Sequence, residues 1–159
     1  MKKTLYIFLA VSLIFTACKK EEGCTDPIAS NYNADAEDDD GSCIYGIVGT
    51  WTPNTIEQIL YIQNTMSGNW EIFQTVNLPA EDAGFEGNIT FTSDGNFTNI
   101  DSTDPYTVNG NIISIDDGYE IVNLEYTVTK TSLSLAQKDV TDDCQPGMKY
   151  DLTINCTRQ

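Results

Sequence analysis

Residues 46–159 consist of short runs in which apolar and polar side chains alternate, and this alternation constrains the fold more than any other feature. The run 89–92 ends at Asp94-Gly95, and the run 106–108 ends at Asn109-Gly110. These dipeptides favour the tight turns that join antiparallel strands. Further runs of the same kind occupy residues 113–115, 121–128, 133–135 and 148–154. The pattern predicts about eight short strands and an all-β sandwich or up-and-down barrel.

One segment, residues 55–65, allows either a helix or a strand, and we predict an extended strand there. Closing the strands into a barrel would remove the exposed edges that an open sheet leaves. An eight-stranded barrel either fills its interior with side chains or holds one small ligand.

Two motifs of this body resemble a known family. Gly49-Thr50-Trp51 resembles the Gly-x-Trp that opens lipocalins, and residues 90–97 resemble a strand-turn-strand motif of the lipocalin-like domains of Bacteroidota lipoproteins. The resemblance spans nearly all of 47–157. It implies a lipocalin-like antiparallel up-and-down barrel over residues 46–159, with Trp51 closing one end. Lipocalins also pack a basic residue over this tryptophan, a role that Arg158 or Lys149 would take here.

The same resemblance implies a cup that binds a small apolar or amphipathic molecule. The candidate ligand-binding side chains are the aromatic ones of the alternating runs, Phe91, Phe97, Tyr106 and Tyr126. If all four point inward, they plug the barrel. The alternative is therefore a structural or protein-interaction module with a filled barrel and no small ligand, because a fold does not by itself fix a function.

The first 22 residues resemble a targeting signal. Residues 1–17 join two lysines to an apolar run of about 11 residues, which is too short for a spanning helix and typical of a secretion signal. Residues 15–18 resemble the bacterial lipobox, which implies that Cys18 is lipidated and anchors the chain to a membrane. The linker 18–22 resembles the surface-export signal of Bacteroidota lipoproteins, although a plain charged linker would look similar. We expect an outer-membrane lipoprotein that faces the cell exterior.

Residues 23–45 form a separate acidic segment. They resemble a short module of secreted Bacteroidota proteins that begins with Cys-Thr-Asp-Pro and ends with Asp-Asp-Gly-Ser-Cys, which implies a bridge between Cys24 and Cys43. The segment is rich in carboxylates, the ligands that calcium prefers, although their spacing does not match an EF-hand. A calcium site and a solvated acidic spacer remain the two interpretations, and the candidate ligands are Asp26, Asp35, Asp38, Asp39 and Asp40.

The cysteine count of five becomes even once Cys18 is assigned to lipid. The four others allow three disulfide connectivities in an exported protein. With Cys24 and Cys43 paired, Cys144 and Cys156 are left to each other by elimination. A straight strand over residues 148–156 would hold these two about 20 Å or more apart, so their bridge requires a chain reversal near residues 149–151 or a long loop that folds back.

Composition argues against several functions. The formal net charge is −16, which opposes binding to nucleic acid. The chain has no histidine, so it lacks the usual general base and the usual zinc ligand. We expect no enzymatic activity and no cofactor, apart from the calcium considered above. Residues 101–103 (Asp-Ser-Thr) match a short pattern for O-glycosylation, with Ser102 as the acceptor; a plain surface loop is the alternative.

Overall fold

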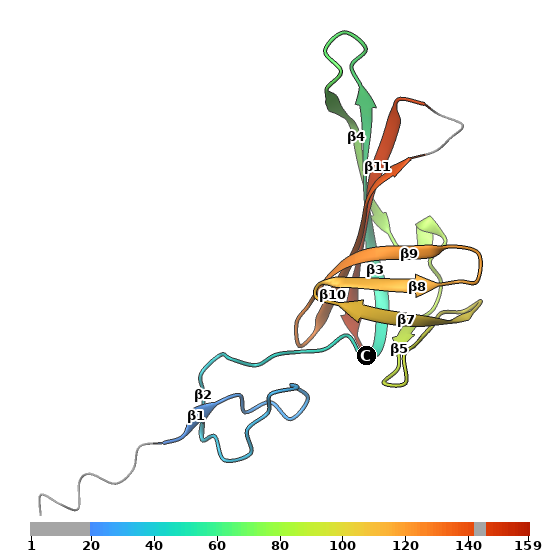
Figure 1. Ribbon diagram of the computed structural model, residues 1–159. Helices are drawn as coiled ribbons and strands as arrows, with labels where there is room; N and C mark the ends of the chain where they lie inside the picture. Colours follow the sequence, from blue (N-terminus) through green and yellow to red (C-terminus); the bar gives the residue numbers. More distant parts are fainter. Residues whose placement is uncertain (1–19, 142–145) are drawn as a thin grey trace, which may run out of the picture. The chain divides into compact units, whose positions relative to one another are not determined.

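The structure is a computed structural model that describes residues 20–141 and 146–159. The predicted leader 1–17, the predicted lipidation site Cys18 and the cysteine Cys144 lie outside the described residues. The chain divides into two compact units, with the boundary between Tyr45 and Gly46. The described part of the first unit is residues 20–45, and that of the second is residues 46–141 and 146–159 (Figure 1).

The N-terminal unit is a small disulfide-bonded module. Strand β1 (Glu22–Gly23) pairs in parallel with β2 (Asp38–Asp39). The predicted bridge between Cys24 and Cys43 is confirmed. The Asn31 side chain donates a hydrogen bond to the Ser42 carbonyl at 2.7 Å and accepts one from the Ile44 amide at 2.7 Å. The disulfide and this amide together fasten the C-terminal part of the module to its beginning.

The second unit is an antiparallel β-barrel, which confirms the predicted fold class. A short 3₁₀ helix, η2 (Glu81–Ala83), interrupts the strand order. The strands are β3 (Gly49–Gln63), β4 (Trp70–Pro79), β5 (Ile89–Phe91), β6 (Asn96–Thr98), β7 (Thr103–Asn109), β8 (Ile112–Asp116), β9 (Ile121–Val128), β10 (Ser132–Thr141) and β11 (Met148–Arg158). Each strand from β5 to β11 pairs with the next, and β11 pairs back onto β3 to close the ring.

The sheet has nine strands but only eight strand positions around the barrel, because β4 and β5 follow one another along the same edge of β3. Both pair antiparallel with the same strand, β4 along Thr55–Gln63 and β5 along Gly49–Trp51. Residues 80–88 leave the sheet between them and carry η2. The predicted strand over residues 55–65 is confirmed for residues 55–63, which belong to β3, whereas residues 64 and 65 lie in the turn that follows. Strand β4 was not predicted from the sequence.

The closed end of the barrel is packed around Trp51, which is fully buried together with Phe91, Ile113 and Leu133. The indole N–H donates to the Ile47 carbonyl at 2.7 Å. The Arg158 guanidinium lies 4.2 Å from the centre of the Trp51 ring. It also donates hydrogen bonds to the carbonyls of three residues, Gly46, Val48 and Lys130. Arg158 therefore links the first strand to the β9–β10 turn by cation–π and hydrogen-bond contacts.

This arrangement explains the glycine of the Gly-Thr-Trp motif. Gly49 has φ 143°, a backbone conformation that disfavours residues with a side chain. A Cβ atom at this position would lie 2.8 Å from the Arg158 guanidinium. The glycine thus provides the space in which the arginine reaches the tryptophan.

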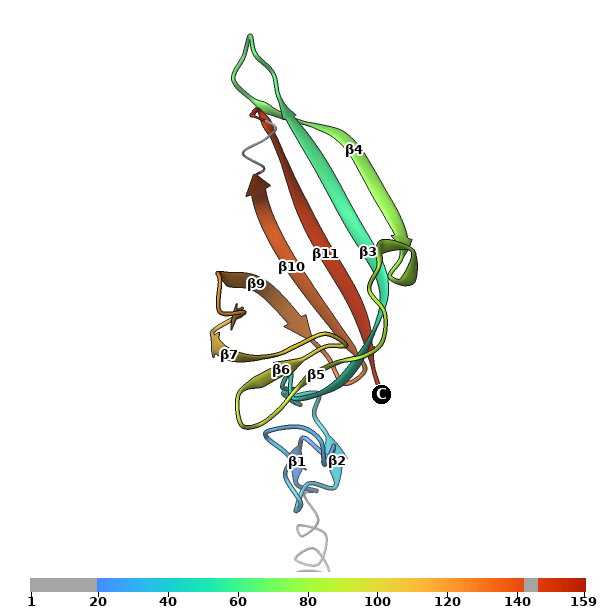
Figure 2. The same cartoon turned by 90° about the vertical axis from the view of Figure 1, so that its right-hand side faces the viewer.

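Four strands continue beyond the closed barrel as an open sheet, which we call the extension: β4 with residues 55–63, 137–141 and 148–152 (Figure 2). Directly opposed residues share a face, so the pairs Leu60–Tyr150 and Ile62–Met148 lie on the same side as the core pair Ile56–Ile154. The apolar inner face of the barrel therefore continues along the extension, where its side chains are half-buried.

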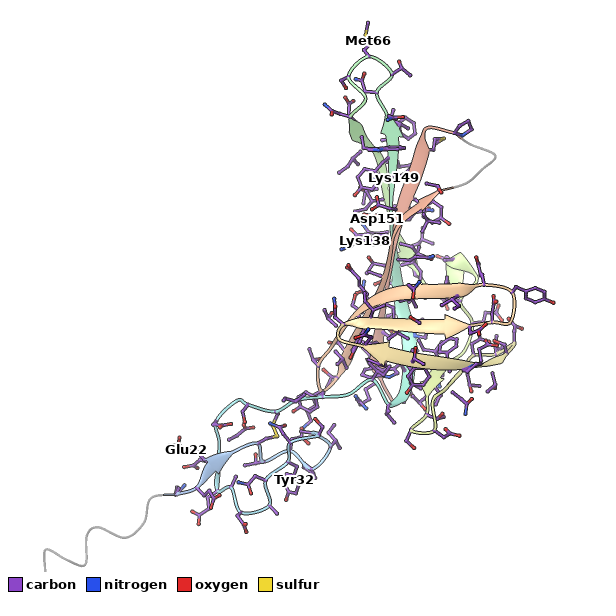
Figure 3. All side chains as sticks on the ribbon, in the orientation of Figure 1. Glu22, Tyr32, Met66, Lys138, Lys149 and Asp151 are labelled. Atoms are coloured by element: carbon purple, nitrogen blue, oxygen red, sulfur yellow. A yellow bond between two sulfur atoms is a disulfide. The ribbon has the colours of Figure 1, made fainter. Side chains whose placement is uncertain are left out.

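The other face of the extension carries a polar cluster around Lys149, labelled in Figure 3. The Lys149 ammonium lies 5.3 Å from the centre of the Tyr61 ring and 5.0 Å from that of Trp70. It also pairs with Asp139, and this hydrogen bond raises the pKa of the ammonium. The Tyr61 hydroxyl donates to Asp151 at 3.1 Å. Lys149 thus ties all four strands of the extension together and does not pack over Trp51.

Candidate ligand cavity

The open end of the barrel contains a cavity of about 480 Å³, which we call the cup. Its volume falls within the range of small-molecule sites, about 300–1,000 Å³. Eight strands contribute lining residues, and six of them (β5, β6 and β8 to β11) supply the main apolar side chains through alternate, inward-pointing residues. The main apolar side chains are Ile89, Phe97, Ile115, Val122, Leu124, Leu135, Leu152 and Ile154. The cup therefore lies above the packed closed end and opens beside the inner face of the extension.

The mouth of the cup is acidic. Glu86, Asp101, Asp104 and Asp117 are among its lining residues. Asp104 accepts a hydrogen bond from the Ser102 hydroxyl at 2.6 Å. Backbone amides of Glu120 and Tyr119 donate to Asp117 and lower the pKa of its carboxyl group. Of the described residues that line the cup, none is lysine or arginine.

A second hollow of about 540 Å³ adjoins the cup, with which it shares Pro53, Phe85 and Glu86, and lies between the segment 79–88 and residues 52–54 of β3. Its lining is mixed and includes Glu81, Glu86 and Asn88, with Phe85 as the one large apolar side chain. Apolar walls with a few polar groups are typical of ligand sites. The cup fits that description better and is the candidate site.

Of the four aromatic side chains that the sequence predicts to bind ligand, one lines the cup and three lie in the packed part of the barrel. Phe97 lines the cup, whereas Phe91, Tyr106 and Tyr126 are absent from its lining. The Phe91 ring centre lies 5.1 Å from those of Phe97 and Tyr106, so the three rings pack as one cluster. The Tyr106 hydroxyl donates to the Thr92 carbonyl at 2.9 Å, and that of Tyr126 to the Gly110 carbonyl at 3.3 Å. Aromatic side chains fill the closed half, and aliphatic ones surround the space that remains.

The candidate calcium ligands of the N-terminal module form hydrogen bonds or ion pairs with different partners. Asp26 accepts the Tyr45 hydroxyl at 2.9 Å, and Asp38 pairs with Lys20 at 3.0 Å. Asp39 and Asp40 accept backbone amides two residues ahead. No group of three or more Asp, Glu, Cys or His side chains in the described part of the chain is arranged to hold a metal. The structure does not gather Asp26, Asp35, Asp38, Asp39 and Asp40, and calcium binding stays a prediction.

Ser102, the candidate glycosylation site, lies at the mouth of the cup. It is half-buried, and its hydroxyl donates to Asp104 and contacts the Asn99 side chain at 3.3 Å. The loop prediction agrees with its place between β6 and β7. Glycosylation itself stays a prediction.

The expected partner of Cys144 is a free thiol in the structure. Cys156 is 2% exposed and packs in the barrel core, so it does not form the bridge that elimination had left. The strand register explains this correction. Thr141 pairs with Lys149, seven residues along β11 from Cys156, which corresponds to about 23 Å at 3.3 Å per residue. The last described residue before Cys144 is therefore far from the second cysteine, whereas a bridge requires about 7 Å or less.

The buried thiol leads to a pH-dependence that can be measured. Burial raises the pKa of Cys156 to about 11 from an ordinary 9.0. The folded state keeps this proton between pH 9 and 11 while the unfolded chain releases it, so stability falls as pH rises through that window, by roughly 3 kcal/mol in all. Urea unfolding at pH 8, 10 and 11 checks this. In the Cys156→Ala variant the free energy of unfolding is expected to fall less between pH 9 and 11, because no thiol titrates there. An equal fall in the variant and the parent would contradict the assignment of this pH dependence to Cys156.

Comparison with known proteins adds no relative. No family model, no curated protein and no solved structure matches the chain. Within residues 20–141 and 146–159, no helix has the length and hydropathy needed to cross a membrane.

Proposed function

We propose that the barrel is a non-enzymatic binding module that holds a small apolar or amphipathic molecule in the cup. The observation that carries this proposal is the apolar cavity of about 480 Å³ at the open end of an otherwise packed barrel. Apolar surface that loses contact with water contributes about 25 cal/mol per Å² to binding. Leu124, Leu135 and Ile154 offer such surface to a ligand.

The cellular location that we propose for this module is inferred from the sequence pattern. We propose that Cys18 carries lipid and anchors the protein to the outer membrane, facing outward, in the manner of Bacteroidota lipoproteins with a lipocalin-like domain. The features that support it are the lipobox-like residues 15–18 and the linker 18–22. Without residues 1–17, which contain Lys2 and Lys3, the chain keeps 6 basic and 24 acidic side chains, and a net charge of −18 favours solubility beyond the anchor.

The test of ligand binding uses a pair of tryptophan substitutions on one strand. Val122 lines the cup, whereas its neighbour Ile121 is 62% exposed on the opposite face of β9. Val122→Trp is expected to fill the cup and weaken binding of the uncharged dye N-phenyl-1-naphthylamine at least tenfold. Ile121→Trp is expected to leave the affinity unchanged.

Both variants are made in the full chain with Cys18→Ala, which removes the predicted lipid site. Circular dichroism confirms that each one is folded. Dye titration by fluorescence then gives the affinities. Equal affinities in the two variants, or no dye binding in the parent, would overturn the proposal.

A second function, contact with a protein partner, is favoured by one observation. Among the residues that the structure describes, strand β4 pairs with β3 along one edge only, and it exposes Ile72 and Phe73 by 63% and 61%. An apolar strand with a free edge is the kind of surface to which another chain adds. Failure of the dye experiment would make this the leading function.

A further inference from the structure

We propose that the ligand of the cup is a cationic amphiphile: an apolar chain or ring that carries an amine or a quaternary ammonium group. This inference rests on the proposed function, because it names the ligand class of the same cavity. The apolar part would lie against the aliphatic walls, and the cation would lie at the mouth.

The polar end of the cup offers carboxylates from three separate segments. Glu86 comes from the segment between β4 and β5, Asp104 from β7, and Asp117 from the turn after β8. Asp104 is half-buried beside the apolar wall, so its charge is screened less by water than that of an exposed acid. The hydrogen bonds to Asp117 favour its ionised form. A cation at the mouth would meet carboxylates from all three segments.

The basic side chains that would receive an anion are placed elsewhere. Residues 46–159 contain four of them, and all four are described. Arg158 lies over Trp51 at the closed end, and Lys130 is in the β9–β10 turn whose carbonyl Arg158 contacts. Lys138 pairs with Glu125 at 2.7 Å, and Lys149 pairs with Asp139. None of the four lines the cup.

An anionic amphiphile would therefore place its head group among like charges without a compensating cation. Two like charges within a few ångströms repel each other, and the repulsion grows where the apolar wall lowers the local dielectric. A fatty acid or an alkyl sulfate should bind weakly for this reason. A cationic head of the same size gains the same interactions with the opposite sign.

The test compares three competitors that share a decyl chain: decyltrimethylammonium, decyl sulfate and decyl maltoside, each below its micelle concentration. They displace N-phenyl-1-naphthylamine from the full chain with Cys18→Ala at about 0.15 M salt. We expect the ammonium compound to displace the dye at a concentration at least tenfold lower than the sulfate does, with the maltoside between them.

A matched pair of double variants shows whether the rim causes the preference. Asp104→Asn with Asp117→Asn removes two carboxylates of the mouth and is expected to cut the ammonium-to-sulfate ratio at least fivefold. Glu57→Gln with Glu71→Gln changes the net charge equally, at positions that do not line the cup, and is expected to leave the ratio nearly intact.

The outcomes separate the two proposals. Equal displacement by all three competitors would overturn the cationic assignment and leave the apolar cup in place. Equal losses in the two double variants would overturn it too, since the preference would then arise from the field of the whole molecule. If the dye does not bind, or Val122→Trp does not weaken its binding, both proposals fail.

Discussion

Replacing Trp51 with alanine is expected to lower the free energy of unfolding of the barrel by about 3–5 kcal/mol, as large-to-small core substitutions of aromatic residues do. Trp51 is fully buried, and its ring is covered by the Arg158 guanidinium. Its loss leaves a cavity, removes the hydrogen bond to Ile47 and deprives the arginine of its stacking surface. Urea unfolding followed by far-ultraviolet circular dichroism measures the change.

The second tryptophan of the chain provides the control. Trp70 is 39% exposed and contacts Lys149 on the outer face of the extension. Trp70→Ala is expected to cost on the order of 1 kcal/mol, because a partly exposed ring loses less buried surface and an exposed cation–π contact contributes little. Similar losses in the two variants would show that the closed end is not the centre of barrel stability.

Removing the bridge of the N-terminal module, by Cys24→Ser with Cys43→Ser, is expected to unfold residues 20–45. The module buries few side chains, chiefly Cys24, Asp26 and Ala29 in its described part. On the chain-entropy model a disulfide that closes a loop of about 20 residues contributes roughly 3 kcal/mol. So small a core has no reserve to absorb that loss.

Hydrogen exchange detected by mass spectrometry tests this result. Backbone amides such as those of Asn33 and Glu37, which donate to carbonyls within the module at 2.8 Å each, should lose their protection. The full chain with Cys144→Ser keeps the bridge and serves as the control. Unchanged protection in the double variant would mean that hydrogen bonds alone hold the module together.

Much of the barrel was predictable because its turns are marked. Asp94-Gly95 and Asn109-Gly110 both stand where the chain reverses, and the alternation beside them identifies strands β5 to β8. Strand β4 has no such dipeptide beside it. Its residues alternate in the sequence, but a register shift between Leu60 and Tyr61 sends Ile72 and Val76 to opposite faces. Pairing partners and bulges of this kind are set by three-dimensional packing.

The site was less predictable than the fold. The alternation of apolar and polar residues indicates which side chains point into the barrel, and it identified Leu124 and Leu135 as inward-pointing. It does not show which part of the barrel interior is filled by side chains and which part is left as a cavity. The start of β9 is an instance: the sequence pattern included Ile121, whereas the structure turns Val122 toward the cup. The choice between Arg158 and Lys149 also required the closed ring, because each packs on an aromatic ring about a hundred residues away in the sequence, Arg158 on Trp51 and Lys149 on Tyr61.

The separation of a packed end from an open end has a consequence for altering this protein. The contacts that hold the barrel closed involve Trp51, Phe91 and Arg158, and none of these lines the cup. The mouth is built instead from the segment 80–88 and the turns 99–102 and 117–120. The sequences of these three short connections can be replaced or varied while the strands and the packed end of the barrel stay unchanged. The barrel is thus a natural starting scaffold for libraries of binders with new specificities.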